Sequence, residues 1–266
     1  MKAKARRIKY RIAWLPVLCL FVVLHPEFAA ASDWYLRGTL GYEWSRAADF
    51  SDTDCRSTNP PALFGFSAGS DGQPIGAYGD FGHFPLIEAA VGRQLLPWLR
   101  ADIAFVYRFN MDYDGNANFL SVGADQPVSA KAESLSGMVN VFFDMAGLVG
   151  KSSGLFQPYV GGGIGLAWNR IDQITFLFPD NTGKHKISIT PSGDRKDFAF
   201  MLTIGTGIIL TKHLTLDMAY RYCDLGRVGT DPGNMYMDVR PAGITINDID
   251  APLRTHGMTV GLRYRF

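Results

Sequence analysis

The sequence predicts an all-β chain: an eight-stranded antiparallel up-and-down transmembrane β-barrel that forms after a signal peptide is cleaved. Three observations predict this fold. Eight segments alternate between apolar and polar residues with the two-residue period of a β-strand. Long polar connections alternate with short ones along the chain. Aromatic residues gather near both ends of the apolar faces, as they do at the two interfaces of a membrane.

The N-terminus has the three parts of a secretory signal peptide. Six Lys and Arg side chains precede an uncharged apolar run over residues 12–24, and small residues at 29–31 offer a cleavage site. The alternative is a membrane-anchoring helix, but this run is too short to cross about 30 Å of hydrocarbon. We therefore expect residues 1–31 to be removed and residues 32–266 to form the barrel.

Charge and composition exclude several kinds of partner. Residues 1–31 hold six of the 26 basic and one of the 25 acidic side chains, so the remaining chain has a net charge of −4. This balance argues against a nucleic-acid partner. After residue 31 no stretch has the roughly 20 apolar residues of a transmembrane helix, so strands must provide any insertion. We also expect no cofactor and no metal, since the acidic stretch at 112–116 lacks the spacing and the distal Glu of a calcium loop.

The predicted strands begin directly after the cleavage site. In "DWYLRGTLGYEW" (33–44), one set of alternate positions is apolar and aromatic, while the other set carries Arg37 and Glu43 among small residues. Three further segments alternate as cleanly: "WLRADIAFVYRF", "LTLDMAYRYC" and the C-terminal "HGMTVGLRYRF". Four segments follow the pattern less cleanly: "PLIEAAVGRQL", "SLSGMVNVFFD", "PYVGGGIGLAW" and "DFAFMLTIGTGIIL".

The connections between these segments set the topology. Four of them are long and rich in Asp, Asn, Gly, Ser and Pro, which is typical of loops. They cover about 46–84, 110–131, 170–197 and 226–253. Because they alternate with short turns, an up-and-down barrel places all four loops at one end and both termini at the other.

The distribution of charge indicates which face of the predicted strands contacts lipid. The apolar face is nearly free of charge over all eight segments, whereas the opposite face carries both signs. A cation facing lipid at the midplane costs about 2–4 kcal/mol, so the charged face should line the interior. An open strand edge would leave backbone groups unsatisfied in hydrocarbon, so the last strand should pair with the first.

We predict an interior charge cluster whose opposite charges pair, stabilise the wall and fill the narrow lumen of an eight-stranded barrel. Its predicted members are Arg37, Glu88, Asp102, Asp217, Arg221 and Arg263.

Aromatic residues on the apolar face form two predicted belts. Those near the short turns are Trp34, Trp98, Phe143, Tyr264 and Phe266, and those near the long loops are Tyr42, Trp44, Tyr107, Phe109, Trp168, Phe198, Tyr220 and Tyr222. Such belts match the two water–lipid interfaces.

Two cysteines remain after the signal peptide. Cys55 lies in the first long loop and Cys223 at the loop end of the seventh segment, so both belong to the same rim. An exported compartment permits a disulfide. The two thiols either bond or stay unpaired, and their shared rim favours the bond.

The chain resembles the small eight-stranded outer-membrane barrels of Gram-negative bacteria, in the OmpA-like and opacity-type porin group. The resemblance lies in "DWYLRGTLGYEW", in "QPYVGGGIGLAW" and in the terminal Phe266 with its alternating apolar neighbours. It implies an outer-membrane location with periplasmic termini and contact with lipid and lipopolysaccharide. It also implies that the assembly machinery of the outer membrane reads the terminal strand at Met258, Val260, Leu262, Tyr264 and Phe266.

Three functions stay open at this point. The first is a non-enzymatic scaffold for the envelope that presents four loops to a host or environmental ligand and has no large pore. The second is a small porin-like channel. The third is an outer-membrane enzyme acting on lipid A, which is disfavoured because no His has a nucleophile and a carboxylate placed as catalysis requires. We therefore expect no enzymatic activity.

Overall fold

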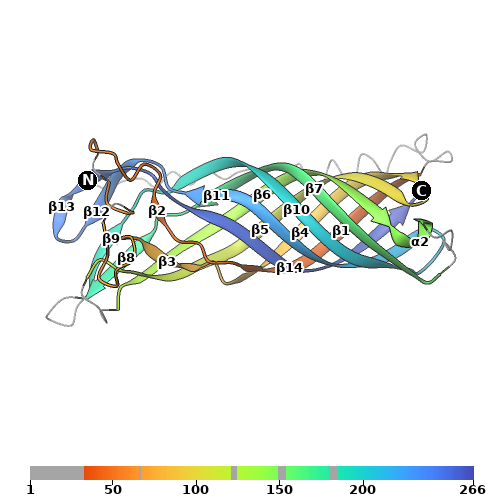
Figure 1. The fold of residues 1–266 in the computed structure, drawn as a ribbon, viewed down its shortest axis with the longest axis horizontal. Coiled ribbons are helices and arrows are strands. Elements are labelled where there is room, and N and C mark those ends of the chain that lie inside the picture. Colours follow the sequence, from red (N-terminus) through yellow and green to blue (C-terminus); the bar gives the residue numbers. More distant parts are fainter. Residues whose placement is uncertain (1–32, 61, 66, 121–124, 149–153, 180–184) are drawn as a thin grey trace, which may run out of the picture.

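Eight long strands wind around one axis and close into an elongated barrel in the computed structural model (Figure 1). The strands are β1 (Trp34–Ser45), β4 (His83–Leu96), β5 (Leu99–Ala117), β6 (Pro127–Asp144), β7 (Phe156–Ile171), β10 (Gly193–Ile209), β11 (Leu214–Gly229) and β14 (Ile249–Arg265). The structure describes residues 33–60, 62–65, 67–120, 125–148, 154–179 and 185–266. The predicted signal peptide lies outside the described residues.

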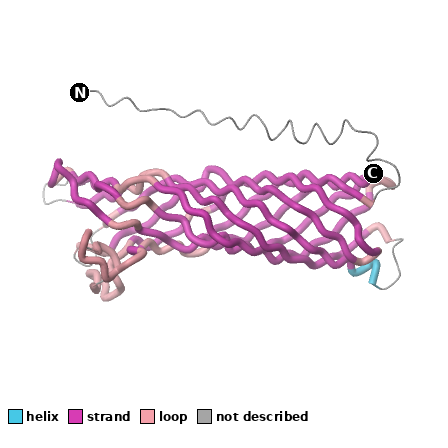
Figure 2. The backbone as a smooth tube through the Cα atoms, turned by 90° about the horizontal axis from the view of Figure 1, so that it is seen from above, coloured by secondary structure: helices cyan, strands magenta, loops and turns pink. Residues whose placement is uncertain are grey.

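Each long strand pairs antiparallel with its two neighbours, and the ring closes between the last strand and the first. Leu40 of β1 lies opposite Ile87 of β4 on one side and opposite Val260 of β14 on the other. The strands cross the barrel axis obliquely along its whole length (Figure 2). The predicted eight-stranded antiparallel barrel and its closure are therefore confirmed.

The two described chain ends meet at the short-turn end of the barrel. The amide of Phe266 donates a hydrogen bond to the carbonyl of Trp34 over 3.1 Å. At this end lies α2 (Met145–Leu148), a single helical turn after β6. No helix among the described segments is long and apolar enough to cross a membrane.

The other end carries additional short strands. β8 (Thr175–Pro179) and β9 (His185–Ile189) form one hairpin, and β12 (Gly233–Met237) and β13 (Arg240–Ile246) form a second that pairs with β9. β3 (Ala77–Asp80) pairs with β5, and β2 (Ser51–Asp52) pairs with β14. The long connections therefore contain strands where the sequence predicted irregular loops.

The connection predicted at 110–131 is the clearest difference. β5 continues to Ala117 and β6 already begins at Pro127, and the two pair beyond the expected strand ends. A bulge interrupts the ladder between Arg108 and Met111, where Asn110 has a φ of 55°. The extra residue moves the buried positions from the even numbers 100–108 to the odd numbers 111–117.

This change of parity reverses the sidedness of β5. Below the bulge the apolar side chains of β5 face outward, as lipid requires, whereas above it Met111 and Tyr113 face inward and Asp112 faces outward. The upper part of the barrel is therefore built like a water-soluble barrel with an apolar interior.

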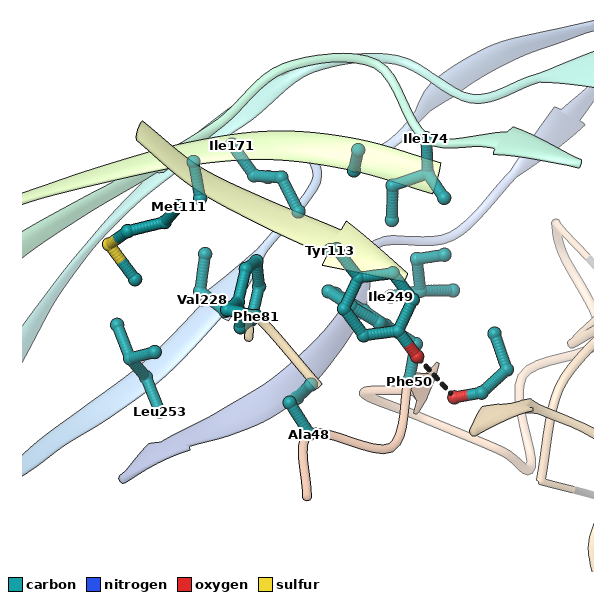
Figure 3. Close-up of a cluster of buried hydrophobic side chains, with 14 of the residues drawn as sticks. Ala48, Phe50, Phe81, Met111, Tyr113, Ile171, Ile174, Val228, Ile249 and Leu253 are labelled. Carbon is teal, nitrogen blue, oxygen red and sulfur yellow. Dashed lines mark hydrogen bonds between the residues drawn. The ribbon is translucent and has the colours of Figure 1, made fainter. Parts of the chain in front are cut away.

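A hydrophobic core fills this upper part (Figure 3). Phe50, Phe64 and Phe81, from the connection between β1 and β4, are each 1% exposed and pack into it. Phe50 and Phe81 both make edge contacts with the ring of Tyr113, at centroid distances of 5.0 and 5.2 Å. The first long connection thus folds over the mouth of the barrel and fills it.

Candidate functional site

The predicted interior charge cluster lies inside the lower part of the barrel, and four of its six members form one linked network. Arg37 bridges two carboxylates, with its Nη1 2.6 Å from Glu88 Oε1 and its Nη2 2.7 Å from Asp102 Oδ2. Arg221 Nη1 lies 2.7 Å from the other oxygen of Glu88. These contacts link β1, β4, β5 and β11 across the lumen.

The remaining two predicted members form a separate pair. Arg263 donates from Nε to Asp217 Oδ2 over 3.0 Å and from Nη2 to Asp217 Oδ1 over 3.1 Å. This two-pronged geometry connects the neighbouring strands β14 and β11.

Two more buried ion pairs complete the interior, and the predicted cluster omitted them. Arg108 pairs with Glu43 at 2.7 Å, and Arg100 pairs with Asp144 at 3.1 Å. All four occupy inward positions of segments that the sequence identified as strands. The two-residue alternation already places these four on the charged face, so the prediction missed only their membership of the cluster.

Aromatic rings hold the lowest arginine in place. The guanidinium carbon of Arg100 lies 4.4 Å from the ring centroids of both Phe142 and Tyr159, and these two rings stand edge to face at an interplanar angle of 86°. The glycines on β7 make room for these inner groups. A Cβ at Gly161 would collide with the Phe142 ring, and one at Gly163 with the Asn140 amide.

The lumen is therefore closed at the level of the charges. Between Arg37, Glu88 and Arg221 the remaining void measures about 10 Å³, which is the space of about one water molecule. A wider hollow of about 720 Å³ opens at the short-turn end, beside Tyr35 and Arg263. Above the charges the lumen meets the apolar core of the mouth.

The two cysteines are free thiols, so the favoured disulfide is absent from the structure. Cys223 points into the lumen, is fully buried and lies 3.5 Å from Arg108 Nη2. Cys55 belongs to the connection over the mouth. The two sulfurs do not meet, although both residues belong to the same rim, because the Cys223 side chain points into the lumen.

Polar contacts fasten the mouth connection to the wall. Arg195 pairs with Asp248 and with Asp250, the latter at 3.5 Å, while Thr53 donates its amide to the carbonyl of Asp248 over 3.1 Å. Partial burial opposes ionisation of Asp248, but hydrogen bonds from Arg195 and Thr53 outweigh it and hold the pKa of the carboxyl below its usual value. In Asp52, burial prevails over hydrogen bonds from two backbone amides and raises the pKa.

The outward face of β14 carries most of the predicted assembly residues. Met258, Val260, Leu262 and Tyr264 are 63, 47, 50 and 47% exposed, and Phe266 follows directly after the strand. Their exposed row is the lipid-facing stripe that the sequence predicted.

Comparison with known proteins agrees with this architecture. A family model described as "Outer membrane protein beta-barrel domain" matches residues 15–266. Outer membrane protein PagN of Salmonella typhimurium is 24% identical over 170 residues, which cover 63% of this chain and 65% of PagN. The alignment thus spans less than two thirds of that relative.

Two solved structures are also similar. The outer membrane protein OprG of Pseudomonas aeruginosa has a TM-score of 0.45 at 11% identity, with 89% of this chain and 97% of OprG covered. Neisserial surface protein A has a TM-score of 0.39 at 16% identity, with 89% and 99% covered. Because the family model runs through all eight strands of the ring, the chain belongs to the outer membrane β-barrel proteins of Gram-negative bacteria.

Proposed function

We propose that this protein is a closed outer-membrane scaffold that supports the envelope and presents its long connections at the cell surface. The observation that carries the proposal is the filled lumen. Paired charges leave a void of only about 10 Å³, and the apolar core closes the mouth above them. A channel for solutes would require several of these contacts to break together.

The long-loop end faces the cell exterior in this proposal, and both termini face the periplasm. Bacterial barrels keep their short turns on the periplasmic side, and the described chain ends share the short-turn end here. Residues 1–31 act as the cleaved signal peptide, and Met258, Val260, Leu262, Tyr264 and Phe266 form the sequence that the assembly machinery reads.

The two protruding hairpins are the proposed surface for a host or environmental ligand. They expose large apolar side chains: Ile187 is 36% exposed, Tyr236 46% and Val239 59%. Exposed apolar groups on such a projection are typical of interaction surfaces rather than of solvated loops.

The proposed role is not catalytic. His83 packs against Tyr42, while His256 stacks on Trp44 and hydrogen-bonds to Tyr220. Among the described residues, neither imidazole hydrogen-bonds to a serine, a cysteine or a carboxylate. A nucleophile activated by His and oriented by a carboxylate would need such contacts.

Electrophoretic mobility and conductance of the refolded protein test the proposal together. We expect a heat-dependent shift in gel mobility, which reports a folded barrel, and no steady channels in planar bilayers. Steady single-channel conductance would show that the protein is the porin-like channel and not a closed scaffold. Altered lipid A in the mass spectrum of cells that overproduce the protein would instead establish an enzyme.

A further inference from the structure

Two arginines lie directly opposite each other on the outer rim of the barrel. Trp44 of β1 pairs with His256 of β14, and two residues further along the amide of Arg46 donates to the carbonyl of Arg254 over 2.8 Å. Both arginines are exposed and follow the outward-facing parity of their strands. Their side chains therefore leave the wall on the same face and side by side.

Among the described residues, this arrangement leaves one positive charge without a counterion. Like charges directly opposite each other on a sheet are destabilising. Asp224 on β11 accepts a hydrogen bond from Arg254 Nε over 2.9 Å and balances one of the two. No described residue forms a hydrogen bond or an ion pair with the side chain of Arg46.

The corresponding place on the other side of the barrel is built differently. Arg170 also lies two residues beyond a belt tryptophan, Trp168, but the residue opposite it is Glu133, whose Oε1 is 3.8 Å from Arg170 Nη1. Next to it Lys131 lies opposite Asp112, with Nζ and Oδ1 3.8 Å apart. Each cation there lies opposite a carboxylate, whereas in the part of the chain that the structure describes Arg46 and Arg254 together have one acidic partner, Asp224.

An aromatic patch lies directly below this row. The Trp44 and His256 rings stack with centroids 5.9 Å apart, and the Tyr220 hydroxyl lies 3.0 Å from His256 Nδ1. Trp44 and Tyr220 are 38 and 44% exposed on the lipid-facing side. Rings of this kind lie at the level of lipid headgroups, so the two arginines are at the height of headgroup phosphates.

We propose that Arg46 and Arg254 bind a phosphate of lipid A, the anionic glycolipid of the outer leaflet. Guanidinium groups bind phosphate through two parallel hydrogen bonds, and one phosphate between the two arginines supplies the missing negative charge. The inference rests on the proposed orientation, which places the long-loop end in the outer leaflet. The aromatic patch directly below the two arginines favours a lipid over a soluble sulfated polysaccharide, which would bind further from the membrane.

Binding of diphosphorylated lipid A to the protein refolded in zwitterionic micelles tests the site. We expect the double variant R46Q/R254Q to bind about tenfold more weakly than the wild type, because it removes both guanidinium groups that hydrogen-bond to the phosphate. The matched control K131Q/R170Q removes the same charge from the same rim and should keep the wild-type affinity. A heat-dependent shift in gel mobility establishes that all variants are folded.

Three outcomes would overturn the site. The first is an equal loss of affinity in both double variants, which would report net charge alone. The second is a wild-type protein that binds dephosphorylated lipid A or phosphatidylglycerol as tightly as diphosphorylated lipid A. The third is displacement of bound lipid A by a soluble heparin-type polysaccharide. Labelling of Lys186 on intact cells by a membrane-impermeant reagent tests the orientation separately, so that a failed site and a wrong orientation can be told apart.

Discussion

Arg108 of β5 donates a hydrogen bond from Nε to Oε2 of Glu43 on β1 over 2.7 Å, and both side chains are completely buried in the lumen. The same oxygen accepts a hydrogen bond from Thr255 over 2.9 Å, and Arg108 Nη1 donates to Ser136 over 3.0 Å. The pair therefore joins four strands that the backbone ladder connects only one after another. It lies where the charged interior gives way to the apolar mouth.

Removing the carboxylate of this pair should be strongly destabilising. Glu43→Gln leaves Arg108 buried without its counterion, and such a loss costs about 3–5 kcal/mol of unfolding free energy. The matched control Glu133→Gln breaks an exposed pair with Arg170 and should cost less than about 1 kcal/mol. Urea unfolding of the refolded variants measures both values, and equal small losses would show that the interior pair does not stabilise the barrel.

The bulge at Asn110 predicts a second effect on stability. A φ of 55° is a left-handed conformation that Asn and Gly tolerate and that costs other residues about 1–2 kcal/mol. We expect Asn110→Val to lower the unfolding free energy by that amount and Asn110→Gly to be nearly neutral.

A control for this effect lies further along the same strand. Asn116 faces outward on β5 outside the bulge, so Asn116→Val should leave the unfolding free energy unchanged. Equal behaviour of the two valine variants would show that the left-handed conformation at Asn110 makes no special demand on the residue at the bulge.

The sequence determines the lower wall more clearly than the upper one. From Leu99 to Arg108 the alternation shows directly which side chains face lipid. Closure of the barrel follows because the backbone N–H and C=O groups of the first and last strands need hydrogen-bond partners. The upper wall was missed because Asp112 and Asp114 resemble loop residues, although Met111 and Tyr113 continue the alternation with reversed sidedness. Because the bulge adds one residue, a search for a strict two-residue alternation does not recognise residues 111–117 as a continuation of the same strand.

The packing in the mouth of the barrel could not be predicted from the sequence for a different reason. Phe50, Phe64 and Phe81 belong to a connection without periodicity, and only the closed ring creates the apolar space that they fill. The same limit applies to the predicted disulfide. The parity of β11 shows that Cys223 faces the lumen, but the sequence around Cys55 has no periodicity that would show where Cys55 lies.

The two thiols should differ in reactivity. Cys55 is partly exposed, whereas Cys223 is buried next to Arg108. We expect a bulky maleimide to label only Cys55 in the folded protein, and both residues after unfolding without a reductant. Mass spectrometry of the intact chain counts the labels, and an unfolded chain that takes up none would establish a disulfide instead.

The sidedness of the lower wall has the most direct test. Leu40 and Val260 lie opposite each other on β1 and β14 and are 67 and 47% exposed on the face assigned to lipid. Spin labels at these two positions, in a Cys55→Ser background, should report acyl chains: high accessibility to oxygen and low accessibility to a water-soluble nickel complex. A label at Lys186, on the protruding hairpin, should show the opposite preference because that hairpin lies beyond the belt. If the labels at Leu40 and Val260 respond like the one at Lys186, the apolar stripe does not face hydrocarbon, and the assignment of the charged face to the interior loses its physical basis.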